Sequence, residues 1–223
     1  VKETVYGNRM NLAPNCIGGV KCDVPPELLL YIRRQVEKMR PAVEEIRDIY
    51  ATNSMVLGRT KGIGLLPHDD AVRLGVVGPV ARGSGIAHDA RKDSPYAAYM
   101  DMEFNVPVYH GACIHSRTMV RLDEIMESFG IIGQCCERMP DGPVTAPMRQ
   151  VHVAEACARS EAPRGEVFYY IRTNGSDMPE RLKWRVPSYM NWEALGVMML
   201  DCAVADVALI TNSIDPCVSC TER

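Results

Sequence analysis

The chain has 223 residues and a formal net charge of −3 at pH 7. This length predicts one domain over residues 1–223 with room for a sizeable core, and the mild acidity gives no indication of nucleic acid as a partner. Nine cysteines are an odd number and no signal peptide is recognisable, so a reducing cytoplasm without disulfides is expected. No apolar run reaches the roughly 20 residues that a membrane-spanning helix needs.

The first third of the chain is predicted to be mostly helical. Residues 1–24 are rich in turn formers. Over residues 27–50 the apolar positions keep a spacing of 3–4, which predicts a helix that Pro41 kinks or splits. Residues 51–68 are short and Gly-rich, and a short helix is expected over 69–74.

Residues 78–99 form the most irregular stretch. Glycines alternate there with the charged or titratable residues Arg82, His88, Asp89, Arg91, Lys92 and Asp93. A loop of this length and polarity is either a solvated surface loop or a functional one. It contains no Gly-x-Gly-x-x-Gly spacing, so no nucleotide site is predicted.

The middle of the chain contains the clearest helical pattern, over residues 116–139. Before it, a weak alternation over residues 103–109 predicts a short strand. His110, Cys113 and His115 lie between these two elements. Their spacing does not match a structural zinc site and a fourth ligand is missing, so we interpret them as ordinary structural residues.

The C-terminal third predicts a small sheet and a last helix. Residues 144–160 show no clear pattern. Residues 167–172 and 181–186 read as two strands joined by a turn, which predicts a hairpin. Residues 190–210 are apolar enough for one buried helix that leads to the C-terminal residues. The predicted fold class is therefore mainly α with a small antiparallel β-sheet, an α+β fold.

An arginine lies between a proline and a glycine in Glu161-Ala162-Pro163-Arg164-Gly165. In such a restricted setting the guanidinium of Arg164 is well placed to point at a fixed target. The alternative is an ordinary ion pair with Glu161 or Glu166 where a strand begins.

The last residues are Asp215-Pro216-Cys217-Val218-Ser219-Cys220-Thr221-Glu222-Arg223. Thiolates spaced as Cys217 and Cys220 can reach one metal ion, and they suit zinc, iron–sulfur centres and copper(I). Pro216 is expected to hold Asp215 in an extended conformation. A single pair of this kind also occurs as a redox couple or as half of a structural zinc site, and no second Cys-x-x-Cys is present.

Residues 161–165 and 213–223 resemble two signatures of the large subunit of nickel–iron hydrogenases. The Thr-x-Arg ending resembles that of the membrane-bound, energy-converting branch. The resemblance covers nearly all of the chain and includes the quinone-site subunit of respiratory complex I, which shares a segment similar to residues 78–99. It implies the helical core of a hydrogenase large subunit, of which this chain would be the C-terminal part.

The resemblance also implies roles for individual residues. Cys217 would be a terminal nickel ligand and the first proton acceptor, and Cys220 would bridge nickel to an iron that carries carbon monoxide and cyanide. Arg164 would lie over this centre, oriented by Asp215. The predicted site residues are the catalytic Arg164, Cys217 and Asp215, the cofactor-binding Pro163 and Ser213, and the metal ligands Cys217 and Cys220.

The function implied by the resemblance is reversible oxidation of hydrogen coupled to ion translocation. The implied partners are a small subunit with iron–sulfur clusters and membrane subunits that translocate ions, at the cytoplasmic side of the cell membrane. The Arg-x-Cys-Gly-x-Cys motif that supplies the other two thiolates in this family does not occur here. We therefore expect a fragment or one half of a split subunit, completed by a separate chain that carries the N-terminal cysteines.

Two other functions fit parts of the sequence. A metal-free structural and coupling subunit would resemble the complex I relative. A zinc-binding interaction module would need four ligands that the sequence does not bring together. The presence of Cys217 and Cys220 behind Asp215 and Pro216 favours the metal-binding interpretation.

Overall fold

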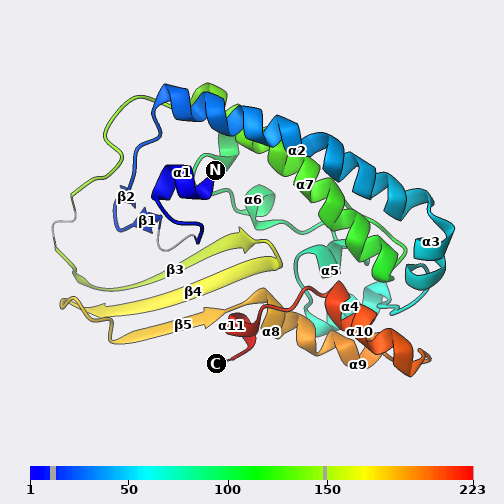
Figure 1. The fold of residues 1–223 in the computed structure, drawn as a ribbon. Helices are drawn as coiled ribbons and strands as arrows, with labels where there is room; N and C mark the ends of the chain where they lie inside the picture. Colours follow the sequence, from blue (N-terminus) through cyan, green and yellow to red (C-terminus); the bar gives the residue numbers. More distant parts are fainter. Residues whose placement is uncertain (11–13, 148–149, 223) are drawn as a thin grey trace.

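The computed structural model describes residues 1–10, 14–147 and 150–222, and it is an α+β fold as predicted (Figure 1). Arg223, the last residue of the hydrogenase-like ending, lies outside the described residues. In chain order the elements are α1 (Lys2–Tyr6), β1 (Asn15–Cys16), β2 (Gly19–Val20), α2 (Pro26–Thr52), α3 (Ser54–Thr60), α4 (His68–Leu74), α5 (Pro79–Arg82), α6 (Ala90–Asp93), the 3-10 turn η1 (Tyr99–Asp101), α7 (Ile114–Arg138), β3 (Val153–Ala162), β4 (Gly165–Asn174), β5 (Arg181–Arg185), α8 (Pro187–Trp192), α9 (Ala194–Met198), the 3-10 turn η2 (Val204–Asp206), α10 (Val207–Ser213) and α11 (Val218–Thr221).

The two long helices α2 and α7 pack side by side in opposite directions (Figure 1). Ion pairs join Arg33 to Glu137 at 2.8 Å and Arg47 to Asp123 at 2.6 Å, which is the order expected of an antiparallel pair. Pro41 lies inside α2 without dividing it, so the prediction of a split is wrong. The proline removes one hydrogen bond of a 27-residue helix, and the helix continues through it while packed along α7.

The main core lies below this helix pair, where α4, α5, α9 and α10 meet the first turns of α7. Its fully buried members are Leu66, Ala71, Val80, Ala194, Met198, Ile210 and Ile214. The Gly-rich residues 51–68 contain α3. None of the helices in the described residues combines the length and the apolar composition needed to cross a bilayer.

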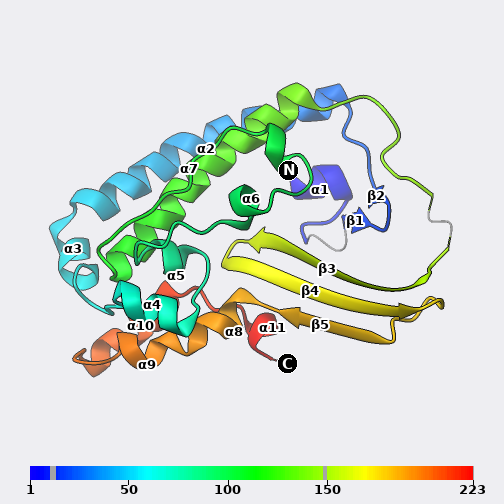
Figure 2. The same cartoon turned by 180° about the vertical axis from the view of Figure 1, so that it is seen from behind.

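The three-stranded sheet has the order β3-β4-β5 and is antiparallel throughout. The β4–β5 pair confirms the predicted hairpin, whereas β3 lies in the region without a clear sequence pattern. Most of β3 is exposed on both faces, so it lacks the alternation of buried and exposed positions that identifies a strand. Figures 1 and 2 show the sheet extending away from the helices, with its β3–β4 tip close to α6.

Two predicted elements are absent from the described residues. Residues 103–109 form no strand, because their backbone bonds to side chains of α7: Glu103 N donates to Gln134 Oε1 and Asn105 N to Glu127 Oε2, both at 2.9 Å. The apolar stretch 190–210 is divided among α8, α9, η2 and α10 rather than being one helix. The chain turns at Asp201, whose φ of 57° is incompatible with a continuing helix.

The irregular segment 78–99 is not a solvated surface loop. Arg82 and Asp89 are almost fully buried, at 1% and 0% exposure, and α5 belongs to the core. Buried charges need partners, so this segment is fixed by ion pairs to α7 and β3.

Candidate functional site

The C-terminal turn is anchored on α8. Cys217 N donates to Ser188 Oγ at 3.0 Å, and Thr221 Oγ1 donates to Cys217 O at 2.9 Å. Trp192 Nε1 in turn donates to Thr221 Oγ1 at 2.9 Å. Figure 1 shows α11 beside α8. A terminal segment is normally frayed, and these bonds hold the cysteine pair in place.

The pKa of the Cys217 thiol is lowered by neighbouring groups in the same turn. The Ser219 hydroxyl lies 3.1 Å from Cys217 Sγ, and this hydrogen bond is the largest cause that lowers the pKa of Cys217 to about 7. The Cys220 side chain also hydrogen-bonds the sulfur, and the positive charge of Arg164 adds a smaller effect. Close to neutral pH a large fraction of Cys217 is therefore thiolate, the form that binds metals.

Arg164 occupies the tip of the β3–β4 hairpin and reaches the chain just before the cysteines. Its Nε donates to Asp215 O, and Nη2 lies 3.2 Å from Asp215 Oδ1. The predicted contact between Arg164 and Asp215 is thus present. The alternative pairing with Glu161 or Glu166 is not found, because these carboxylates bind other arginines.

Asp215 is not extended, contrary to the prediction from Pro216. Its φ is 52°, in the left-handed region that aspartate tolerates better than most residues. Asp215 N donates to Asn212 O at 2.9 Å, which closes the turn after α10. In this conformation both the carbonyl and the carboxylate of Asp215 face Arg164, so two hydrogen bonds compensate for the strained backbone.

The arginine turn rests directly on another stretch of backbone. Gly165 has φ +129°, and a Cβ there would lie 2.7 Å from Gly78 N. A Cβ on Gly78 would lie 2.3 Å from Arg164 O, so only two glycines allow this approach. The neighbouring Val77 is held by Asn191 of α8, which accepts from Val77 N at 3.0 Å and donates to Val77 O at 3.2 Å. Helix α8 thus supports the arginine turn as well as the cysteine turn.

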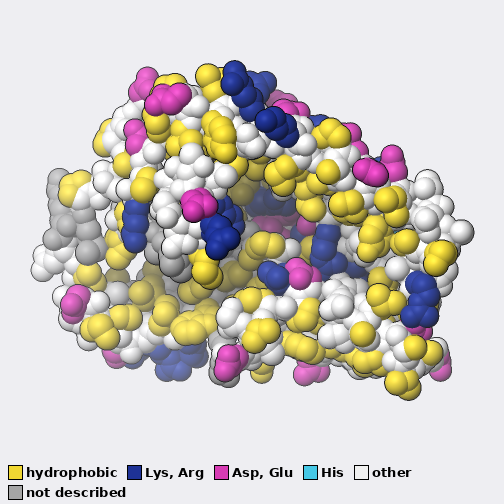
Figure 3. All heavy atoms as spheres, viewed as in Figure 1, with side chains coloured by type: hydrophobic (Ala, Val, Ile, Leu, Met, Phe, Trp, Pro, Cys, Tyr) yellow, Lys and Arg dark blue, Asp and Glu magenta, His cyan; other side chains and the backbone are white. Residues whose placement is uncertain are grey.

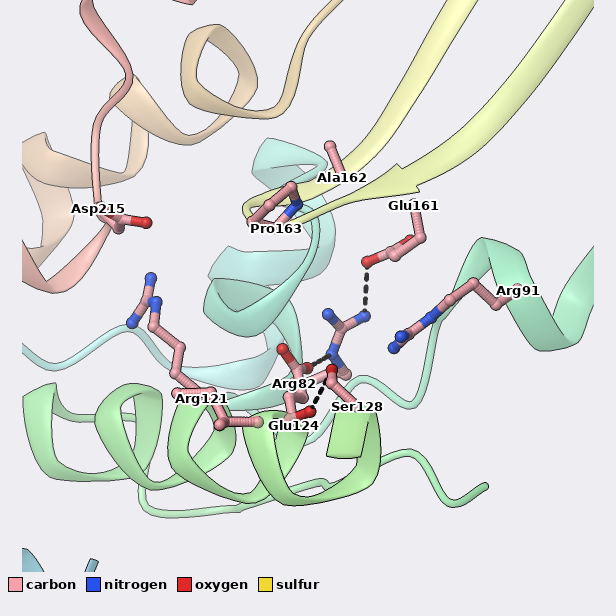
Figure 4. Close-up of a pocket in the computed structure, with 10 residues that line it drawn as sticks. Arg82, Arg91, Arg121, Glu124, Ser128, Glu161, Ala162, Pro163 and Asp215 are labelled. Carbon is pink, nitrogen blue, oxygen red and sulfur yellow. Dashed lines mark hydrogen bonds and ion pairs between the residues drawn. The ribbon is translucent and has the colours of Figure 1, made fainter. Parts of the chain in front are cut away.

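A cavity of about 350 Å³ lies between α7, the tip of the β3–β4 hairpin and Asp215 (Figure 4). Figure 3 shows a hollow between the helix pair and the lower part of the molecule, with acidic and basic side chains on its walls. Inside the cavity Arg82 bridges Glu124 at 2.6 Å and Glu161 at 3.0 Å. Burial raises the pKa of both carboxyls, and the charge of Arg82 opposes this rise. Pro163 lines the same cavity, next to Asp215.

Ser213 is buried, and its hydroxyl bonds to protein groups. It accepts from Arg117 Nε at 3.0 Å and donates to Ile210 O at 2.6 Å. Arg117 also donates to Gly64 O at 2.9 Å, so Ser213 ties the C-terminal segment to α7. A contact of Ser213 with a cofactor stays a prediction.

The residues fit half of a four-thiolate metal site. Within residues 1–10, 14–147 and 150–222, no three His, Cys, Asp or Glu side chains come close enough to hold a metal ion. Cys217 and Cys220 are nevertheless neighbours, and one of them has a lowered pKa. His115 and Cys113 have separate hydrogen-bond partners, Tyr50 O at 3.1 Å and Ser116 Oγ at 3.6 Å.

The residues that position the site are not among those predicted from the sequence. Ser188 and Asn191 of α8 and Arg117 of α7 act through bonds to residues far away in sequence. No motif or spacing marks them. The one available signal was a charged residue, Arg117, close to the apolar stripe of the predicted helix.

Comparisons with known proteins show related subunits. The family described as "Respiratory-chain NADH dehydrogenase, 49 Kd subunit" matches residues 1–156 and 148–223. The carbon monoxide-induced hydrogenase of Rhodospirillum rubrum is 51% identical over 224 residues, covering 100% of this chain and 62% of that protein. An NADH-quinone oxidoreductase subunit of a Roseiflexus species is 34% identical over 224 residues, which cover 96% of this chain and 60% of that protein. An F(420)H(2) dehydrogenase subunit of Methanosarcina mazei is 34% identical over 230 residues, which cover 99% of this chain and 62% of that protein. The chain thus spans about three fifths of the length of these relatives.

Proposed function

The chain belongs to the family of the 49 kDa subunit of respiratory-chain NADH dehydrogenase, and from this premise we propose that it is the C-terminal part of the catalytic large subunit of a membrane-associated nickel–iron hydrogenase. The observation that carries the proposal is the adjacent pair Cys217 and Cys220, with a lowered Cys217 pKa, fixed on α8 next to the Arg164–Asp215 ion pair. The 51% identity to a carbon monoxide-induced hydrogenase supports this choice within the family.

Cys217 and Cys220 would hold the metal centre together with two thiolates from outside the described residues. When bound, a nickel–iron centre with carbon monoxide and cyanide on the iron supplies the heterolytic cleavage of hydrogen. Cys217, whose backbone is held by Ser188, would accept the proton on Sγ. Its hydrogen bond from Ser219 stabilises the thiolate before the proton arrives.

Arg164 contributes a fixed positive charge. An arginine stays protonated at any working pH, so it stabilises negative charge that develops beside the cysteines. The carboxylate of Asp215 keeps the guanidinium in one orientation through the 3.2 Å bond to Nη2. Pro163, next to it in the turn, forms part of the cavity wall.

The partners follow from the same proposal. Electrons from the site need an iron–sulfur small subunit, and ion translocation needs membrane subunits. The chain would associate with them peripherally at the cytoplasmic side of the membrane. A separate chain or segment with the N-terminal cysteines would complete the metal ligands.

A metal-free coupling subunit is the second candidate. It is favoured by the 34% identity to an NADH-quinone oxidoreductase subunit, together with the lack of a third metal ligand near the cysteines in the described residues. The two candidates differ in one measurable property, the metal content of the intact complex.

The test is elemental analysis and infrared spectroscopy of the complex purified from its native host. We expect nickel and iron together with cyanide and carbonyl stretching bands. Cys220→Ser should remove nickel and the bands, whereas Cys157→Ser, an exposed cysteine on β3, should keep both. No metal in an intact wild-type complex would refute the catalytic proposal and favour the coupling subunit. Zinc alone would support an interaction module.

A further inference from the structure

Arg121 of α7 presents buried hydrogen-bond donors that have no acceptor. Its Nη1 donates to Arg117 O at 3.1 Å. Its Nε and Nη2 are both out of reach of solvent and have no hydrogen-bond partner among the described residues. Figure 4 shows the guanidinium extending from α7 into the cavity, toward Asp215. Buried donors are rarely left unpaired in native proteins, so this pair indicates a missing acceptor.

The charged neighbours of Arg121 are already paired. Glu124 and Glu161 share Arg82, at 2.6 and 3.0 Å. Asp215 binds Arg164 at 3.2 Å. Each of these carboxylates is thus bound to another arginine, and none of them hydrogen-bonds Nε or Nη2 of Arg121, which leaves these two donors for an acceptor from outside the described residues.

The two unpaired donors define the chemistry of this acceptor. Nε and Nη2 form one edge of the guanidinium plane, with two parallel N–H bonds that match the two oxygens of a carboxylate. The neighbouring Glu124 and Glu161 carboxylates would repel a dianion such as phosphate, which favours a monoanion. The cavity of about 350 Å³ has room for such a group, and Ile125 and Pro163 provide apolar parts of its wall.

We propose that this cavity is a carboxylate-binding site anchored by the Nε and Nη2 atoms of Arg121. The carboxylate is either that of a small free acid such as formate or that of an aspartate or glutamate from another segment or chain. The inference goes beyond the proposed function and does not depend on a metal at Cys217 and Cys220.

The first arm of the test measures binding of formate to the intact complex by titration calorimetry. We expect saturable binding to the wild type, weakened about tenfold or more in Arg121→Gln, where the charge and the paired donors are lost. Arg121→Lys should bind less tightly than the wild type, because an ammonium group lacks the paired edge. Arg138→Gln, at the exposed end of the same helix, is the matched control and should bind formate like the wild type.

The second arm applies if formate does not bind to the wild type. An electron cryomicroscopy map of the same complex, without added acid, should then show an aspartate or glutamate side chain on Nε and Nη2 of Arg121. Water alone at these atoms, or Asp215 turned away from Arg164 to pair with Arg121, would overturn the inference. Nickel content measured on the same samples separates the two proposals, because formate binding without nickel refutes only the hydrogenase function.

Discussion

Replacing Arg82 with methionine tests whether the buried ion cluster stabilises the fold. Arg82 is 1% exposed and binds Glu124 at 2.6 Å, Glu161 at 3.0 Å and His88 O at 2.7 Å. Without it, two buried carboxylates lose their common cation. Removing one partner of a buried ion pair costs about 3–5 kcal/mol, and we expect Arg82→Met to lower the free energy of unfolding by this amount. That is a large share of the roughly 5–15 kcal/mol that stabilises a typical domain.

The loss should depend on pH. Burial raises the pKa of Glu124 and Glu161 in the wild type, and the charge of Arg82 limits that rise. In Arg82→Met both pKa values should rise further. A carboxyl whose pKa is higher in the folded state stabilises the fold below its unfolded pKa of about 4.3, and this contribution is lost as the pH rises through the folded pKa. The free energy of unfolding of the variant should therefore be closest to that of the wild type in acid and furthest below it above neutral pH.

The assay is urea unfolding of the purified protein at about pH 5.5 and pH 8, a range that spans the expected titration. Arg73→Met is the matched control, because Arg73 is 63% exposed and pairs with Asp70 at 2.7 Å. It should change the free energy of unfolding by less than about 1 kcal/mol. The double variant Arg82→Met/Glu161→Gln should recover part of the loss at the higher pH. The reasoning is refuted if Arg82→Met lowers the free energy of unfolding no more than Arg73→Met does, or lowers it equally at both pH values.

Two further predictions concern the turns that form the site. In metal-free protein, Ser219→Ala should raise the pKa of Cys217 from about 7 toward the ordinary value of roughly 8.5, which slows alkylation of Cys217 at pH 7 by about fivefold or more. Ser219→Thr keeps the hydroxyl, and its Cys217 should be alkylated at the wild-type rate. An unchanged alkylation rate in Ser219→Ala would exclude the hydroxyl as the main cause of the lowered pKa. Gly165→Ala should lower the free energy of unfolding by about 2 kcal/mol or more, because φ is +129° and the new Cβ would lie 2.7 Å from Gly78 N. Gly133→Ala in α7 has open space around the new methyl group and should be neutral or stabilising by up to about 1 kcal/mol; equal unfolding midpoints for the two glycine variants would contradict the close-packing argument.

The parts of the fold that could be predicted are those with a regular pattern of burial. Helix α7 buries one stripe of side chains and α2 half-buries one, and the β4–β5 hairpin has a turn signal between two strands. Strand β3 could not be predicted, because exposure on both faces removes the alternation. The break of the apolar stretch 190–210 could not be predicted either, because composition alone does not report the left-handed turn at Asp201.

At the site, the chemical groups could be predicted from short sequence motifs, but the residues that hold them in position could not. Arg164 and the two cysteines lie in short distinctive strings, and the predicted contact of Arg164 with Asp215 is present. The unpaired donors of Arg121 depend on which carboxylates other arginines occupy, and that is a property of the folded structure alone.

Helix α8 explains how a chain end and a hairpin tip, 51 residues apart at the Arg164–Asp215 contact, keep a fixed geometry. Asn191 holds the backbone at Val77 on which the arginine turn rests, and Ser188 and Trp192 hold the cysteine turn. Both turns are therefore held by the same helix of six residues. Pro187 starts that helix, and Ser188 and Asn191 are fully buried, so these two supporting side chains are shielded from solvent. The arginine turn and the cysteine turn are in this way positioned by the same secondary-structure element, which holds side chains more precisely than two independent loops would.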